Sequence, residues 1–235
     1  MALLRDHDLS AAFDHASRSY DRMTSASPGY HSHLRRSARR LGLAHEGSGL
    51  TVLDLGCGTG ASTQALLHAA PHATITGVDA SAGMLRRAQA KQWPGSVSFA
   101  HVPVESMTAA GFTGPYDAVF AAYLFRNLAD PDAVLRLVHD VLRPGGRLVV
   151  HEYALGGRPV HRAIWSAVMS GLVVPWGRLN GDASLYEHLR RSVLDFDTAT
   201  QFAQRLGRAG FTQVRTLPLP GWQTGITHTF TARRR

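Results

Sequence analysis

The sequence predicts an α/β fold in which a mostly parallel sheet carries helices on both faces. Short apolar runs alternate with helical stretches from residue 50 to residue 155, and such alternation requires right-handed crossovers between parallel strands. A glycine-rich segment follows the first apolar run and precedes a helical stretch, as nucleotide-binding loops do. Of the 235 residues, 44% are hydrophobic, which is enough for a substantial core.

The first 45 residues are predicted to form a helical cap. An apolar stripe from Leu9 to Tyr20 repeats at helical spacing, and a second helix is expected over residues 30–43. A Ser-Pro-Gly triplet marks the turn between them.

Residues 46–155 are predicted to form the cofactor half of the core. Strands are expected at residues 50–55, 74–78, 97–102, 117–122 and 147–151. Helices are expected at residues 61–70, 81–92 and 131–142, with Ser81 as the N-cap of the second.

Residues 156–195 interrupt this alternation with several glycines and prolines. We interpret them as a helical lid inserted over the carboxyl ends of the strands. A helix at 198–209 and strands at 213–217 and 225–232 then complete the core within residues 196–235. The final arginines, Arg233–Arg235, are typical of an unstructured end.

Charge and cysteine content restrict the classes of function. The formal charge is +8, and nearly all the positive charge is arginine because Lys91 is the only lysine. Scattered arginine pairs are more typical of solvated helix faces than of a nucleic-acid surface. The single cysteine, Cys57, excludes an internal disulfide and fits the cytoplasm. We expect neither a signal peptide nor a membrane-spanning helix, because no run of about 18 apolar residues exists.

The strongest functional signal is the segment Asp54-Leu55-Gly56-Cys57-Gly58-Thr59-Gly60. Its glycines allow a sharp turn and a close approach of the backbone to a ligand. A carboxylate before the first glycine would repel a diphosphate, whereas it suits the ammonium group of S-adenosylmethionine. We therefore expect S-adenosylmethionine as the cofactor, with Asp54 as the direct or water-mediated partner of its ammonium group.

A second acid, Asp79, ends the next strand and is placed to accept both ribose hydroxyls. Adenine is expected near the loop after the third strand, and Tyr20 is expected to close over the methionine end. The predicted cofactor-binding residues are Tyr20, Asp54, Gly56, Gly58, Gly60, Asp79, Ala80, Met84, Val104, Glu105 and Ala121.

The loop and Asp79 together resemble the class I S-adenosylmethionine-dependent methyltransferases. The resemblance implies a Rossmann-like sheet of seven strands in the order 3-2-1-4-5-7-6, with an antiparallel seventh strand. Many relatives carry an acidic residue that holds the adenine amine, and at the aligned position this chain has Pro103. Val104 and Glu105 are the remaining candidates for adenine contacts.

A narrower resemblance extends over nearly the whole chain. The matching segments are Phe13–Met23, Gly77–Leu85, Lys91, Leu124–Leu128, Val141–Arg147, Glu152, Val174–Gly177 and Leu185–Ser192. They resemble the FDxxAxxYDxM, GLRN, PGG and YxYLxxS patterns of the ubiquinone/menaquinone C-methyltransferase family. This resemblance implies methyl transfer to an aromatic ring carbon of a prenylated quinol of the demethylmenaquinol or ubiquinol type.

Such a reaction needs a ring carbon that becomes nucleophilic when a neighbouring phenol loses its proton. A base for that proton accelerates the reaction by about 10²–10⁴. Arg126 stays protonated, so the resemblance implies that it orients a water and stabilises the phenolate. The alternative proton acceptors are His151, Tyr186 and His188, and the predicted substrate-binding residues are Asn127, Glu152, Trp165 and Trp176. No histidine pair has the spacing of metal ligands, so no metal is expected.

The expected partner is a small aromatic molecule of lipidic character, and no nucleic acid is expected because aromatic and basic residues are not interleaved. The apolar stretch at residues 160–174 fits membrane contact and core packing equally well, and a homodimer also stays open. An alternative function is C- or O-methylation of a soluble phenolic or polyketide acceptor. This alternative arises because Leu34, Ala61, Pro103 and Ala121–Tyr123 depart from the family pattern.

Overall fold

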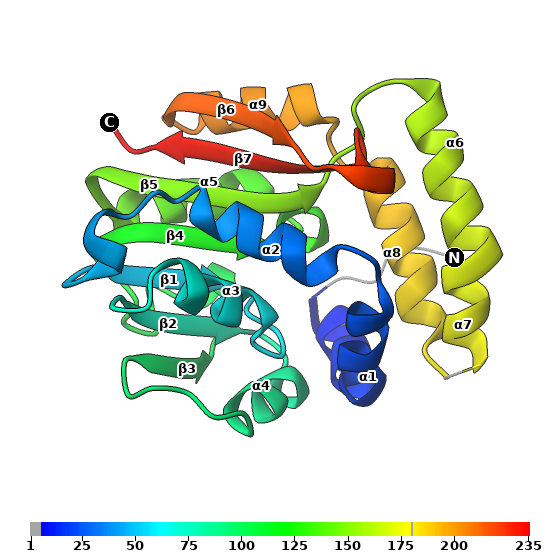
Figure 1. Ribbon diagram of the computed structural model, residues 1–235, viewed down its shortest axis with the longest axis horizontal. Helices are drawn as coiled ribbons and strands as arrows, with labels where there is room; N and C mark the ends of the chain where they lie inside the picture. Colours follow the sequence, from blue (N-terminus) through cyan, green and yellow to red (C-terminus); the bar gives the residue numbers. More distant parts are fainter. Residues whose placement is uncertain (1–5, 180) are drawn as a thin grey trace.

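The computed structural model describes residues 6–179 and 181–235, except for the side chains of residues 6–7, 18–23 and 25–26. One sheet has the strand order β3-β2-β1-β4-β5-β7-β6 (Figure 1). Its strands are β1 (Thr51–Leu55), β2 (Thr74–Asp79), β3 (Val97–His101), β4 (Tyr116–Ala122), β5 (Leu142–Tyr153), β6 (Thr212–Pro218) and β7 (Thr227–Arg233). The strand β7 runs antiparallel to both of its neighbours, β5 and β6, and the other neighbouring strands pair in parallel. The α/β fold class and the strand order implied by the resemblance are confirmed.

Helices cover both faces of this sheet (Figure 1). One face carries α2 (Tyr30–Arg39) and α3 (Ala61–Ala69), and the other carries α5 (Pro131–Val141) and α9 (Ala199–Arg208). Each face has its own apolar core, because the central strands are buried on both sides. The sheet is therefore a rigid support for the loops at its carboxyl edge.

A third group of helices gathers beyond the carboxyl ends of the parallel strands (Figure 1). It comprises α1 (Asp6–Ala26), α6 (Pro159–Val168), α7 (Val174–Leu179) and α8 (Ala183–Asp195). Helix α1 packs against α8 and against α4 (Ala82–Gln89). Short helical turns complete the described elements: η1 (Ala44–Gly47), η2 (Val104–Ser106), η3 (Phe125–Asn127), η4 (Met169–Val173) and η5 (Gly221–Gln223).

Local side chains determine where several helices begin. The Ser81 hydroxyl accepts the Met84 amide at 3.1 Å, which confirms the predicted N-cap of α4. Asp130 caps α5 in the same way, ahead of a proline in the first turn. Thr198 and Gln201 form a reciprocal capping box at the start of α9.

The structure corrects the expectation of an unstructured carboxyl end. Arg233 is the last residue of β7, and the Arg234 amide donates to the Gly146 carbonyl at 2.9 Å. β5 begins at Leu142, five residues before the predicted start, because Leu142 already pairs with Tyr116 of β4. The register between β4 and β5 then shifts before Arg147, where Gly145 has a left-handed φ of 77°. The last strand begins at Thr227 and not at residue 225.

Candidate active site

The glycine-rich loop joins β1 to α3 at the carboxyl edge of the sheet. Gly58 has a φ of 55°, a left-handed conformation that glycine adopts without strain. A Cβ at Gly58 would meet no atom within 4 Å, so the loop borders open space there. By contrast, a Cβ at Gly60 would come within 2.8 Å of the Trp93 side chain. The middle of the loop can therefore receive a ligand, while its end is fixed by packing.

Asp54 is fully buried at the end of β1 and has one carboxylate oxygen without a partner. Its Oδ2 accepts the hydroxyls of Ser62 at 2.8 Å and Thr63 at 2.6 Å. Its Oδ1 has no hydrogen-bond partner among the described residues. Burial raises the pKa of Asp54 to about 7, against the lowering effect of the two hydroxyls. A cation at Oδ1 would supply the positive countercharge that the buried, ionised carboxylate lacks.

Asp79 ends β2 and holds the glycine loop in place. Its two carboxylate oxygens accept the amides of Gly58 and Ser81, each at 2.8 Å. Burial raises the pKa of Asp79, and these two hydrogen bonds oppose that rise. Each oxygen keeps a further lone pair, so the carboxylate can also accept hydroxyl groups.

The remaining predicted cofactor residues surround this edge of the sheet. Met84, Val104 and Ala121 are buried, whereas Ala80 and Glu105 are exposed. Tyr20 belongs to α1, but its side chain lies outside the described residues. The structure thus places these positions near the loop without testing their roles.

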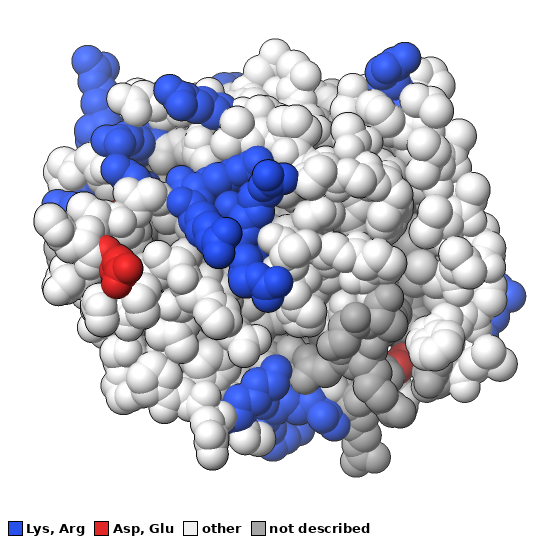
Figure 2. All heavy atoms as spheres, viewed as in Figure 1, with Lys and Arg blue, Asp and Glu red and all other residues white. Residues whose placement is uncertain are grey.

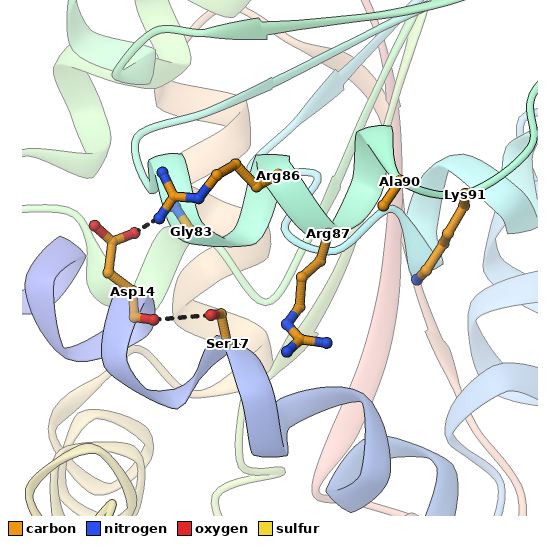
Figure 3. Close-up of a pocket in the computed structure, with 7 residues that line it drawn as sticks. All are labelled: Asp14, Ser17, Gly83, Arg86, Arg87, Ala90 and Lys91. Atoms are coloured by element: carbon orange, nitrogen blue, oxygen red, sulfur yellow. Dashed lines mark hydrogen bonds between the residues drawn. The ribbon is translucent and has the colours of Figure 1, made fainter.

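Helix α1 is attached to the start of α4, beside Asp79. Asp14 Oδ1 accepts the Ser81 hydroxyl at 2.5 Å and the Gly83 amide at 2.7 Å. An open cleft of about 580 Å³ lies between the two helices, and Figure 3 shows Arg87 extending from α4 toward α1. Lys91 Nζ, at the end of this cleft, donates to the Thr59 carbonyl of the glycine loop at 2.7 Å.

A second, smaller cavity of about 60 Å³ lies where α1, α2 and α8 meet the ends of β4 and β5. It is lined by Phe13, Thr24, Ser27, Tyr30, Tyr123, Arg126, Tyr153, Leu185, Tyr186, His188 and Leu189. The ring of Tyr123 stacks on Tyr30 at 5.7 Å and lies 4.6 Å from the ring of Tyr153. A Cβ at Gly56 would come within 3.1 Å of Leu124, so the segment that carries the lining residues Tyr123 and Arg126 contacts the glycine loop.

Arg126 is the charged residue of this cavity. Its Nη1 donates to Glu152 Oε1 at 2.9 Å and to the Tyr123 carbonyl at 2.5 Å. Its Nε is buried and has no hydrogen-bond partner among the described residues. Glu152 is fully buried, and this burial raises its pKa against the lowering effect of Arg126. The guanidinium is therefore held by a buried anion, and its buried Nε–H stays available as a donor.

The three candidate proton acceptors lie in different environments. His188 and Tyr186 of α8 line the cavity, and His188 Nε2 lies 3.1 Å from Asn127 Oδ1. His151 is fully buried in β5, outside the cavity lining, with Nε2 at 2.8 Å from the Tyr123 hydroxyl. Burial lowers the pKa of His151 to about 3. It is therefore neutral and a poor acceptor of a net proton.

The two predicted substrate-binding tryptophans do not line the cavity. Trp165 is buried 4.9 Å from the ring of Tyr153, and its Nε1 donates to the Arg190 carbonyl at 3.1 Å. Trp176 is 51% exposed on α7. Trp165 thus supports a cavity residue from behind, and a substrate contact for either tryptophan stays a prediction.

Sequence reasoning missed the tyrosine wall of the cavity and the residues that hold Asp54. Tyr123 directly follows one predicted strand end and Tyr153 comes two residues after another, and functional residues gather at such ends in parallel sheets. That position was an available signal. Tyr30 carries no sequence signal of this kind, because it comes from a helix in the amino-terminal cap. Ser62 and Thr63 carry a weak sequence signal, because they are hydroxyl residues in the first turn of a helix that follows an acid-bearing loop.

Positive charge gathers on the face that α2 presents to solvent (Figure 2). Arg35, Arg36 and Arg39 are exposed there. Among the described residues, no group of three His, Cys, Asp or Glu residues is arranged to hold a metal ion. In the same part of the chain, no helix has the length and apolar character needed to cross a membrane.

Comparisons with known proteins identify related methyltransferases, in agreement with the geometry of the site. A family model described as the ubiE/COQ5 methyltransferase family matches residues 1–231. A demethylmenaquinone methyltransferase of Lactiplantibacillus plantarum is 32% identical over 221 residues, which cover 88% of this chain and 89% of that protein. A ubiquinone/menaquinone biosynthesis C-methyltransferase of Syntrophotalea carbinolica is 32% identical over 79% of this chain and 77% of its own.

Solved structures share the fold at low sequence identity. The plantazolicin methyltransferase BpumL, in complex with S-adenosylhomocysteine, superposes with a TM-score of 0.66 at 13% identity and covers 96% of this chain and 95% of its own. Human N-acetylserotonin methyltransferase, in complex with S-adenosylmethionine, superposes with a TM-score of 0.54 at 19% identity, over 85% of this chain and 51% of its own.

Proposed function

The chain belongs to the ubiE/COQ5 methyltransferase family, and we propose that it methylates an aromatic ring carbon of a prenylated quinol of the demethylmenaquinol or ubiquinol type. It is an S-adenosylmethionine-dependent methyltransferase whose acceptor is a small aromatic molecule. One observation carries the proposal: an aromatic cavity near the glycine loop holds a buried guanidinium, that of Arg126, whose Nε–H has no hydrogen-bond partner among the described residues.

The residues around the glycine loop fit S-adenosylmethionine. The unpartnered Oδ1 of Asp54 would accept the ammonium group, and Asp79 would accept the ribose hydroxyls. The other residues predicted above to bind the cofactor stay predictions. When bound, the cofactor supplies an activated methyl group on a sulfonium. The protein must hold the acceptor carbon in line with that methyl, and such positioning contributes roughly 7–11 kcal/mol.

Arg126 is suited to stabilise the oxygen of the acceptor as it becomes a phenolate. Nε could donate a charge-assisted hydrogen bond to that oxygen while Nη1 of the same guanidinium keeps its bonds to Glu152 and Tyr123. Glu152 prevents the guanidinium from turning away. Arg126 itself stays protonated, so the proton of the phenol must go elsewhere.

His188 is the proton acceptor that the hydrogen bonds favour. Asn127 Nδ2 donates to the Tyr123 carbonyl at 3.0 Å, and this turns Asn127 Oδ1 toward His188 Nε2. A neutral His188 then carries its proton on Nε2 and accepts through Nδ1. His188 lines the cavity and His151 does not.

The cavity must widen before an aromatic ring can bind. Its volume is about 60 Å³, whereas a cavity that holds benzene measures about 150 Å³. Residues from α1 and α8 form much of the wall, and both helices lie beyond the edge of the sheet (Figure 1). A displacement of one of them would admit the ring without disturbing the strands.

A lipidic acceptor and peripheral contact with a membrane surface belong to the same proposal. Val160, Ile164, Leu172 and Leu179 are exposed on the α6–α7 segment. Apolar side chains of this size on a surface support contact with lipid. A homodimer and a cytoplasmic location stay predictions, and so does methylation of a soluble phenolic acceptor as the alternative function.

Transfer of a labelled methyl group to demethylmenaquinol and to demethylubiquinol tests the proposal. We expect label on the ring carbon of at least one quinol, and no comparable transfer to phenols without a prenyl tail. Replacing Arg126 with Gln should lower kcat by about 100-fold, because one charge-assisted hydrogen bond is lost. The matched control is the exposed Arg136→Gln of α5, with unchanged rates. Transfer only to soluble phenols would replace this function with the alternative.

A further inference from the structure

A buried chain of hydrogen bonds runs from Arg40 of α2 to Tyr123 in the cavity wall. Arg40 Nη1 donates to Thr229 Oγ1 at 2.5 Å, and Thr229 Oγ1 lies 2.7 Å from Ser37 Oγ. Ser37 Oγ lies 2.8 Å from His151 Nδ1, and His151 Nε2 lies 2.8 Å from the Tyr123 hydroxyl. Ser37, His151 and Thr229 are fully buried.

The donor in each of these hydrogen bonds follows from how many protons each group can donate. Arg40 can only donate, so Thr229 Oγ1 accepts from it. Among the described residues the Thr229 hydroxyl has one further partner, Ser37, and a buried hydroxyl whose proton has no acceptor is destabilising. Thr229 therefore donates to Ser37. For the same reason Ser37 donates to Nδ1 of His151.

His151 then has its single proton on Nε2. Its pKa is lowered to about 3 by burial and by the neighbouring His33 and Arg40, so the ring is neutral and carries one N–H. Because Nδ1 accepts from Ser37, Nε2 donates to the oxygen of Tyr123. The proton of the Tyr123 hydroxyl is consequently turned away from His151.

Tyr123 is also held in a strained backbone conformation. Its φ is 57°, a left-handed value that is rare and strained for a bulky aromatic residue. Its amide donates to the His151 carbonyl at 2.7 Å, and its carbonyl accepts from Arg126 and Asn127. Such strain persists only where surrounding contacts impose it, and it is concentrated at functional sites.

We propose that Tyr123 contacts the aromatic acceptor and donates its hydroxyl proton to an acceptor oxygen, with His151 and Ser37 as the positioning residues that fix this direction. The proposal rests on the proposed function for the identity of the acceptor. Arg126 and Tyr123 would then bind acceptor oxygens as two donors from one wall. The specificity that follows is for a ring bearing oxygen substituents, since a ring without them cannot accept a hydrogen bond from either residue.

The tautomer of His151 tests the direction of these hydrogen bonds, and its measurement needs no methyl acceptor. In ¹⁵N-labelled wild-type protein at neutral pH, the Nε2 resonance of His151 should show an attached proton and the Nδ1 resonance should not. Replacing Ser37 with Ala removes the donor to Nδ1, so the two tautomers should become mixed. A wild-type ring protonated on Nδ1 would overturn the proposal, whatever the acceptor proves to be.

Steady-state kinetics test the contact with the acceptor. Tyr123→Phe should lower kcat/KM about 10- to 100-fold, and Ser37→Ala about 3- to 10-fold although Ser37 does not line the cavity. The dissociation constant for S-adenosylhomocysteine should stay within about twofold in both variants. Tyr116→Phe, at the opposite end of β4, is the matched control with unchanged kinetics. Loss of thermal stability with unchanged kcat/KM would reduce Tyr123 to a packing residue, whereas a wild type inactive on quinols would contradict only the proposed function.

Discussion

Replacing Asp54 with Asn should remove a pH-dependent loss of stability from the cofactor-free protein. The pKa of Asp54 rises from 3.8 to about 7 in the folded state, chiefly through burial. At about 1.36 kcal/mol per pKa unit, the ionised carboxylate costs about 4 kcal/mol. The folded state binds more protons than the unfolded state in this range, so the free energy of unfolding falls as pH rises from about 4 to about 7.

Urea unfolding of cofactor-depleted protein at about pH 5 and about pH 8 measures this cost. The fall in unfolding free energy between the two pH values should be smaller in Asp54→Asn than in wild type by about 2.6 kcal/mol, because the rest of the cost is already incurred below pH 5. Asp117→Asn on β4 is the matched control, because Asp117 is paired with Arg143 and accepts the Thr51 amide. That variant should lose stability and keep the wild-type pH dependence. The same fall in wild type and Asp54→Asn would refute the assignment of the cost to Asp54.

The affinity for the cofactor should increase with pH, whereas the stability of the cofactor-free protein decreases. The ammonium group of S-adenosylhomocysteine favours an ionised Asp54, so the affinity of the wild type should increase as pH rises through about 7. Asp54→Asn should bind about 10- to 100-fold more weakly at high pH, because a hydrogen bond between two charges is lost. Calorimetric titration at both pH values measures this, and an unchanged affinity would place the ammonium group elsewhere.

Three further substitutions separate catalysis, cofactor binding and stability. Glu152→Gln should lower kcat about 10- to 100-fold with an unchanged dissociation constant for S-adenosylhomocysteine, because Arg126 loses its orienting anion; initial rates decide this. Lys91→Met should weaken S-adenosylhomocysteine about 5- to 10-fold, because Nζ no longer holds the Thr59 carbonyl; calorimetry that shows no change would contradict it. Arg205→Met should lower the free energy of unfolding by about 1 kcal/mol in urea, with unchanged activity, because its two ion pairs lie at the surface.

The cofactor edge was predictable because its geometry is determined within short segments of sequence. The acid before the first glycine, the glycine spacing and the acid at the next strand end are all local patterns, and the strand order then brings Asp54 and Asp79 to one edge. Arg126 and Glu152 were predicted separately, as a catalytic and a substrate-binding residue, and the structure pairs them at 2.9 Å. Arg126 follows β4, and Glu152 lies near the end of the adjacent parallel strand β5, so the two positions meet at the same edge of the sheet.

The aromatic wall of the cavity could not be predicted in the same way. Tyr30, Tyr123 and Tyr153 come from α2 and from two strand ends, so their meeting depends on how α2 packs on the sheet. The left-handed backbone of Tyr123 has no sequence signature, because an aromatic residue there is held by tertiary contacts and not by local preference. His151 shows the converse limit: its residue type suggests a base, and its burial makes it neutral.

Helix α1 links the two sites, because consecutive residues on it serve each of them. Phe13 lines the acceptor cavity, and Asp14 holds Ser81 and Gly83 at the start of α4, beside Asp79. A ring that enters by displacing α1 must therefore strain the contacts of Asp14 next to the cofactor, whereas a ring that displaces α8 leaves them intact. In the first case the free energies of binding cofactor and acceptor are coupled, and coupling is reciprocal. Whether the cofactor and the acceptor influence each other's binding, and hence their order of binding, therefore depends on whether α1 or α8 moves to admit the ring.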